Sequence, residues 1–171
     1  MIKYSKSLLL IWSLAELEAK NLKQENIHPA HFFLGILKSV EVDLVRILRK
    51  QSEEVQLEIR KDILDLKSCV GEFISDITYT RRFLRNILPR DLQLSVERDS
   101  KLRRSRASRD VFHKCEQLYP SISREVLPIH LLSILLESND PHIVVSLDKA
   151  SIDIGSFKKY TDNFIRKCFG K

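Results

Sequence analysis

Two histidines occupy matching positions in two similar segments of the chain, and they are the first candidates for chemistry. His31 stands in HPAHFFLGIL at 28–37, and His130 stands in LPIHLLSILL at 127–136. Imidazole nitrogens bind zinc and similar ions, but metal sites usually show His or Cys at short, paired spacings. His28 precedes His31 by three residues, and the second segment has a leucine there. We therefore expect two structural histidines, each hydrogen bonded to the loop at a helix N-terminus, and no metal or other cofactor.

Three cysteines are the next candidates, because a thiolate can act as a nucleophile. Cys69, Cys115 and Cys168 are far apart, and only Cys115 has a nearby histidine, His113. On a helix, side chains two positions apart diverge, so this pair does not combine a nucleophile with its base. No paired carboxylates, G-x-S-x-G pattern or G-x-x-x-x-G-K-[ST] phosphate loop is present. We expect buried thiols, and we predict that the chain is not an enzyme and does not hydrolyse ATP through a phosphate loop.

A basic run, ERDSKLRRSRASRD at 97–110, suggests a different chemistry, the binding of phosphates or other anions. It contains Arg103, Arg104 and Arg106, in a chain whose net charge is +6. A nucleic-acid or anionic-surface protein that uses residues 98–109 is therefore an open alternative. No aromatic residue is interleaved in the run and no nucleic-acid motif surrounds it, so we favour a solvated surface segment over a nucleic-acid site.

The overall composition is that of an ordinary globular protein. Among 171 residues, 43% are hydrophobic and 30% are charged, with only four Gly and five Pro. These proportions favour helices and argue against long irregular segments. No apolar stretch approaches the roughly 20 residues that span a bilayer, and no cleavage site of a signal peptide follows the N-terminus. Together with the odd number of cysteines, these features predict a cytoplasmic protein without a membrane span.

The two similar segments belong to a longer internal repeat. With a shift of 99 residues, 27–52 aligns without a gap to 126–151, and Pro29 and His31 are among eight identical positions. Apolar residues at steps of three and four predict four helices in each half. The predicted N-termini lie at Ser5, Pro29, Asp43, Ser105, Pro128 and Asp140. In the last helix, the predicted buried face carries Phe157, Tyr160, Phe164 and Cys168.

We therefore predict an all-α fold made of a duplicated four-helix repeat with a pseudo-two-fold relation. Residues 1–171 form one domain, in which repeat one is 1–70 and repeat two is 105–171. The connector at 71–104 contains an inserted helix in TRRFLRNIL, which Pro89 ends. QLSV at 93–96 alternates briefly, but no segment is available to pair with it, so no sheet is expected.

Three segments of this plan resemble the N-terminal domain of Clp unfoldases, the AAA+ disaggregases and protease partners. LAELEAKNLKQENIHPAHFFLGIL is similar to its first repeat, VFHKCEQLYPSISREVLPIHLLSILLES to its second, and LDKASIDIGSFKKYTDNFI to its closing segment. The resemblance implies a non-catalytic module that binds substrate polypeptides or an adaptor protein and serves an AAA+ ATPase ring in cis or in trans. It leaves open whether that service is protein quality control or disassembly of a secretion apparatus.

The partner-binding surface is expected in an apolar groove between the two halves, where a helix or an unfolded segment could lie. Its candidate lining consists of apolar side chains outside the regular stripes: Ile2, Tyr4, Leu9, Phe83 and Ile87. For the last two, the alternative is that they fix the inserted helix onto the core.

Overall fold

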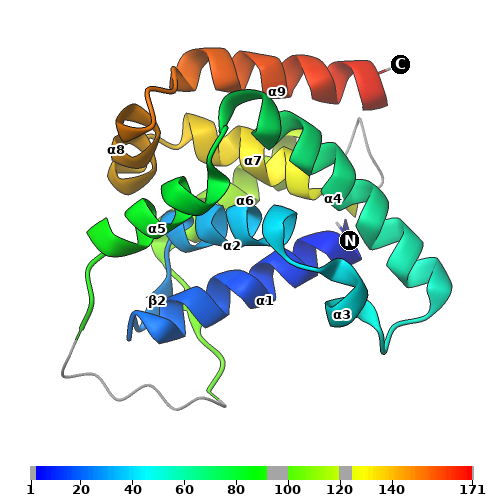
Figure 1. Cartoon of the computed structure of the whole chain (residues 1–171), viewed down its shortest axis with the longest axis horizontal. Coiled ribbons are helices and arrows are strands. Elements are labelled where there is room, and N and C mark those ends of the chain that lie inside the picture. The colour runs from blue at the N-terminus through cyan, green and yellow to red at the C-terminus, as the bar shows by residue number, and fades with distance from the viewer. Residues whose placement is uncertain (1–2, 92–99, 120–124, 171) are drawn as a thin grey trace.

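The computed structural model describes residues 3–91, 100–119 and 125–170, and it is mainly helical there (Figure 1). The first set of helices is α1 (Lys6–Asn21), α2 (Pro29–Glu41), α3 (Leu44–Leu48) and α4 (Glu53–Phe73). After α5 (Ile77–Ile87), the second set is α6 (Arg106–Leu118), α7 (Pro128–Glu137), α8 (Pro141–Lys149) and α9 (Ile154–Phe169). The predicted all-α fold, with an inserted helix between two sets of four, is confirmed. We refer to α1–α4 as repeat one and to α6–α9 as repeat two.

The predicted helix N-termini are confirmed: α2 and α7 begin at Pro29 and Pro128, and the other four have side-chain caps. The Ser5 hydroxyl oxygen accepts a hydrogen bond from the Leu8 N–H at 3.2 Å, and Ser105 accepts one from Ser108 at 3.2 Å. The first N–H groups of a helix lack partners inside the helix, so such caps stabilise it. In the other helices with a side-chain cap, the N-cap residue is Asp43, Ser52, Asp76, Asp140 or Asp153.

Among the described residues, four strands of two residues each connect the repeats, although no sheet was expected. β1 (Lys3–Tyr4) pairs in parallel with β4 (Glu125–Val126), and β2 (Asn26–Ile27) pairs in parallel with β3 (Arg103–Arg104). Two residues are too few to show an alternating pattern, so these strands have no periodic signal in the sequence. The pairing is reciprocal: the strand before α1 pairs with the strand before α7, and the strand before α2 pairs with the strand before α6. QLSV at 93–96 lies outside the described residues.

The core between the repeats contains a cluster of aromatic rings from both of them. The rings of Phe32 and Phe112 are 4.9 Å apart, and Trp12 lies 5.1 Å from Phe112. The Arg104 guanidinium lies 4.5 Å from the centre of the Trp12 ring and 4.7 Å from that of Phe112. Such a stacked cation is stabilised by the negative faces of the rings, so Arg104 helps to hold the repeats together.

The inserted helix α5 packs on α2 and α8 and is anchored by a buried ion cluster. Glu18 in α1 is fully buried, and its carboxylate accepts hydrogen bonds from Arg85 at 2.7 and 2.9 Å. Lys38 lies 3.5 Å from the same carboxylate. Leu84 and Leu88, which belong to the predicted inserted helix, are buried. Because α4 extends to Phe73, the connector predicted at 71–104 begins inside that helix.

The prediction for the buried face of the last helix is wrong in part. Phe157 is buried as expected, but Tyr160 and Cys168 are exposed. The residues of α9 that face the core are Phe157, Thr161 and Ile165, at steps of four. The Thr161 hydroxyl is satisfied by donating to the Phe157 carbonyl at 2.9 Å, so a polar residue can occupy the inner face. The apolar pattern missed Thr161 and included the exposed Tyr160 and Cys168, whereas its remaining residue, Phe164, is half-buried and packs against the core.

Candidate functional site

The predicted groove residues lie on separate elements. Tyr4 is half-buried in β1, where its ring contacts Phe112 at 5.7 Å and its hydroxyl donates to Glu116. Burial and the neighbouring Glu116 carboxylate raise the pKa of Tyr4 to about 12, so the hydroxyl keeps its proton at neutral pH. Leu9 is 48% exposed on α1. Ile2 lies outside the described residues.

The other two groove candidates are on α5. Phe83 is half-buried and stacks on Tyr79, with ring centres 6.4 Å apart, while Ile87 packs against the core. α5 meets α1 at Glu18, which is nine residues, or about 14 Å of helix, from Leu9. The structure therefore does not bring the α5 residues together with Leu9.

The arginines of the basic run also have separate roles. Arg103 is exposed in β3, and Arg106 is exposed at the first position of α6. Arg104 lies between them but turns inward to the aromatic cluster. Arg98 is outside the described residues. Arg103, Arg104 and Arg106 therefore do not form one continuous exposed row.

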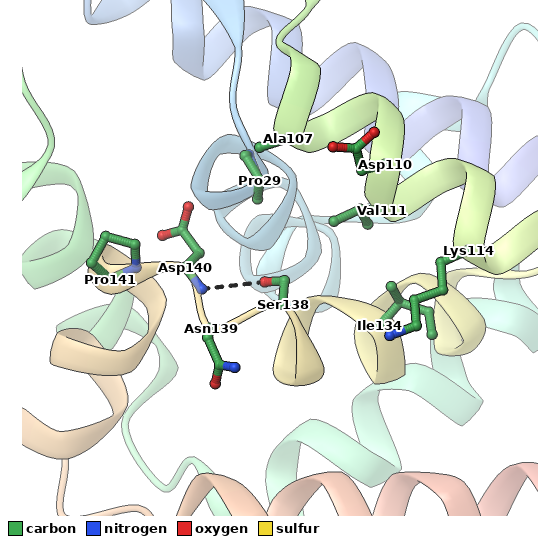
Figure 2. Close-up of a pocket in the computed structure, with 10 residues that line it drawn as sticks. All are labelled: Pro29, Ala107, Asp110, Val111, Lys114, Ile134, Ser138, Asn139, Asp140 and Pro141. Carbon is green, nitrogen blue, oxygen red and sulfur yellow. Dashed lines mark hydrogen bonds between the residues drawn. The ribbon is translucent and has the colours of Figure 1, made fainter.

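A pocket of about 360 Å³ lies where the N-terminus of α2 in repeat one meets α6 and α7 of repeat two (Figure 2). We call it the seam pocket. Its lining comes from both repeats and from the turn between α7 and α8. The lining residues are Pro29, Ala107, Asp110, Val111, Lys114, Ile134, Ser138, Asn139, Asp140 and Pro141.

The seam pocket has an apolar floor and a polar rim. Pro29, Val111 and Ile134 are buried, whereas the side chains of the turn after α7 are mostly exposed. In the rim, the Asp140 carboxylate accepts hydrogen bonds from the first N–H groups of α8, and the Lys114 ammonium pairs with Glu137. An apolar floor with a few polar groups around it is typical of sites that hold one or two side chains of a ligand.

The pocket opens in repeat two because of one difference between the repeats. A Cβ atom on Gly35 would lie 2.8 Å from the Ile11 carbonyl oxygen and 3.2 Å from the Ala15 nitrogen, so the backbones of α1 and α2 touch there. The shift of 99 residues places Ile134 opposite Gly35. The isoleucine side chain fills the space of that close contact, so α6 cannot approach α7 as closely. The resulting gap lies beside Ile134 and Val111.

The two matched histidines have matched hydrogen bonds. The Nδ1 atom of His31 accepts from the His28 N–H at 2.9 Å, and Nδ1 of His130 accepts from the Leu127 N–H at 3.1 Å. Both rings are buried, and the Nε2 atom of each has no partner among the described residues. The prediction of a structural histidine at each helix N-terminus is confirmed. Within 3–91, 100–119 and 125–170, no group of three potential ligands is placed to hold a metal ion.

Burial keeps both imidazoles neutral. It lowers the pKa of His130 to about 4. For His31, burial and the nearby His28 and His142 lower the pKa to about 3. A neutral ring can accept a hydrogen bond at Nδ1, whereas a protonated ring cannot, so the cap and the low pKa support each other.

The thiols are not arranged for nucleophilic chemistry. Cys69 and Cys115 are buried, and burial raises the pKa of each thiol to about 12. A thiol with so high a pKa is protonated at neutral pH and unreactive. Cys168 is exposed, which corrects the expectation that all three are buried.

The sequence analysis expected a groove between the two halves but named none of the residues that line the seam pocket, although part of their signal was present. The alignment at a shift of 99 residues sets Gly35 against Ile134, and a glycine matched to a β-branched residue inside a helix marks a change in packing. The polar rim had no such signal, because Ser138 and Asn139 read as an ordinary turn after a helix.

No family model matches the sequence, and no curated protein matches it. Solved structures do match. A chain from structural work on a malarial protein secretion system is 18% identical, covers 99% of both chains and has a TM-score of 0.56. The Hsp104 N-terminal domain from Candida albicans is 18% identical over 93% of this chain and 89% of that one, with a TM-score of 0.56.

A third match is the N-terminal domain of the caseinolytic protease associated chaperone ClpD from Arabidopsis thaliana. It is 13% identical over 96% of this chain and 95% of that one, with a TM-score of 0.57. The chain therefore has the fold of Clp N-terminal domains, which confirms the resemblance seen in the sequence. No helix in the described part of the chain is both long and apolar enough to cross a membrane.

Proposed function

We propose that the chain is a non-catalytic protein-recognition module that binds an exposed apolar segment of a substrate polypeptide or adaptor protein in the seam pocket. The observation that carries the proposal is the pocket itself, an apolar floor with a polar rim at the junction of the two repeats. Its volume is at the low end of the roughly 300–1,000 Å³ of ligand pockets, which suits one or two apolar side chains.

The partners follow from the fold and remain part of the proposal. Modules with the Clp N-terminal fold are associated with AAA+ chaperones, so we place this chain beside an AAA+ ATPase ring, in cis or in trans. The three cysteines form no disulfide, which fits the reducing conditions of the cytoplasm. The substrate's apolar segments are exposed only when it is unfolded, which fits a role in protein quality control.

Binding of an unfolded protein tests the proposal. The probe is reduced and carboxymethylated α-lactalbumin, titrated by calorimetry into the full chain. Ala107→Phe places a large ring in the pocket from an exposed position of α6, so it should weaken binding about tenfold without unfolding the chain. Ser13→Phe, at an exposed position of α1, is the matched control and should bind like the wild type.

Amide chemical shifts locate the bound segment independently. Saturating probe should shift the amides of Val111, Ile134 and Asn139. The proposal fails if Ala107→Phe binds as tightly as the wild type. It also fails if native α-lactalbumin binds equally well, because a native protein does not expose the apolar segments that the pocket requires.

A further inference from the structure

A second apolar groove lies in repeat one, between α4 and the segment that runs from the end of α2 into α3. α3 and α4 are on the right in Figure 1. We call it the α3/α4 groove. Its volume is about 420 Å³, and α4 contributes one wall through Arg60, Ile63, Leu64 and Lys67. The opposite wall is apolar, with Val40, Val42, Leu44 and Val45. The groove shares no lining residue with the seam pocket, so it is a separate surface.

Large apolar side chains are unusually exposed here. Val45 is 62% exposed on α3, and Leu57 and Leu64 are 60% and 63% exposed on α4. The two leucines are seven residues apart, so they lie on one face of α4, about 10.5 Å from each other along the helix. Isolated apolar side chains are common on surfaces, but a row beside an open groove marks an interaction site.

The charges of the α4 face alternate with its leucines. Arg60 lies between Leu57 and Leu64, and Lys67 follows Leu64 by three residues, so all four share the same face. No described carboxylate forms an ion pair with Arg60 or Lys67, and the Arg60 Nε–H is buried without a hydrogen-bond partner. The guanidinium donates from Nη2 to the Gln56 side-chain oxygen at 3.2 Å, but no described carboxylate neutralises its charge, which is therefore left for an acidic ligand.

The acidic groups around the groove are already engaged. The Asp43 carboxylate caps α3 by accepting from the Val45 N–H at 3.0 Å, and Glu41 pairs with Arg81 at 2.7 Å. Glu58 pairs with Lys6 at 3.5 Å. The lining of the groove carries two cations, Arg60 and Lys67, against the single carboxylate of Asp43, so the local field favours a negatively charged ligand.

The geometry points to the α3/α4 groove as the docking surface for an amphipathic, acidic helix of a partner protein. Apolar side chains at i, i+3 and i+7 of that helix would pack against Leu57, Leu64 and Val45. Carboxylates beside its apolar stripe would pair with Arg60 and Lys67. A helix is the fitting ligand because the exposed row on α4 has a helical repeat of three and four, which a second helix can match by packing ridges into grooves.

Two designed peptides test this inference on the full chain. Each has about 20 residues, long enough to be helical, with leucines at steps of three and four. The first carries glutamates beside the leucines and the second carries lysines in the same places. Fluorescence anisotropy should show that the acidic peptide binds at least about tenfold more tightly, with a difference that shrinks as salt is added.

Variants on the exposed face of α4 locate the binding. Leu64→Ser should weaken the acidic peptide about tenfold and Arg60→Met about fivefold, since buried apolar anchors and charge pairs dominate interfaces. Leu64 is exposed, so the chain keeps its fold, which circular dichroism checks. Leu17→Ser, at a leucine of α1 that is 45% exposed, is the matched control and should leave binding unchanged.

Three results would overturn the inference. Equal binding of the acidic and basic peptides would show that the charges of the face play no part. Self-association of the wild-type chain in sedimentation, abolished by Leu64→Ser, would make a second copy the occupant. If Ala107→Phe abolishes binding of the acidic peptide and Leu64→Ser does not, the peptide binds in the seam pocket. The proposed function would then stand without this second surface.

Discussion

Position 35 in repeat one is glycine, and the equivalent position 134 in repeat two is isoleucine. The glycine lets α1 and α2 touch, whereas the isoleucine leaves a pocket beside α6. The third helices differ in the opposite sense. Val45 in α3 is 62% exposed, whereas its equivalent Val144 in α8 is half-buried, and Ile143 beside it is fully buried.

The inserted helix explains the second difference. α5 packs on α8 of repeat two, and α3 of repeat one has no such cover among the described elements. A duplicated unit first supplies two equal surfaces, and a few local changes then make them unequal. Here, repeat two supplies most of the seam pocket and repeat one supplies the α3/α4 groove, so each repeat is free to specialise in a different contact.

The largest expected effect comes from removing the anchor of α5. Arg85→Met should destabilise the chain by about 4 kcal/mol, because it leaves the fully buried Glu18 carboxylate with only Lys38 at 3.5 Å. Urea denaturation measures the change. The double variant Glu18→Leu with Arg85→Met removes both charges and leaves no unpaired buried carboxylate, so it should recover most of the loss. A single variant as stable as the wild type would show that the ion cluster does not hold α5.

The next effect tests the close contact that distinguishes the repeats. Gly35→Ala should cost about 3 kcal/mol, because its Cβ would lie 2.8 Å from a backbone oxygen that cannot move away easily. Gly71→Ala is the matched control on α4, where a Cβ meets nothing within 4 Å. It should stabilise the chain by about 1 kcal/mol, since alanine favours a helix over glycine. Equal effects at both sites in thermal unfolding would refute the packing argument.

The two buried histidines should make stability depend on pH in the same direction in both repeats. Their folded-state pKa values, about 3 for His31 and about 4 for His130, lie below the ordinary 6.5. The unfolded chain therefore binds more protons, and stability is full above pH 6.5 and is lost as the pH falls toward 4 and below. At pH 5 each histidine should account for a loss of about 2 kcal/mol.

Urea denaturation between pH 5 and 7.5 measures this dependence. The double variant His31→Gln with His130→Gln should lose most of the slope, and each single variant should lose about half of it. A wild-type slope that survives in the double variant would assign the pH dependence to other groups.

The smallest expected effect is the loss of stability when the cap of the first helix is removed in either repeat. Ser5→Ala and Ser105→Ala should each cost about 1 kcal/mol, because each removes one hydrogen bond of 3.2 Å from the first turn of a helix. The two melting temperatures should fall by similar amounts if the caps are equivalent. A much larger loss at Ser5 would show that its second hydrogen bond, to Ser7 at 2.8 Å, stabilises the helix more than the corresponding bond of Ser105 to Ser108 at 3.2 Å.

The sequence alone predicted the helices well because their signals are local. Caps such as Asp43 and Asp140 act within three residues, and the repeat of Pro29 and His31 was visible as a pattern of letters. The face of α9 was predicted incorrectly because a threonine can be buried once its hydroxyl is bonded to the helix backbone. For the candidate site, the sequence predicted a groove between the two halves but not the residues that line it. The predicted groove residues are on separate elements, and none of them lines the seam pocket.

Sequence by itself therefore determined the order of the helices, the duplication and the caps, since these depend on residues a few positions apart. Tertiary structure decided the exchange of strands between the repeats, the pairing of Glu18 with Arg85 and the exposure of Leu64 on α4. Each of these depends on elements from distant parts of the chain, whose packing has no local periodic signal. The two surfaces that distinguish the repeats arise from that packing, because the space beside a side chain is set by whichever helix lies against it.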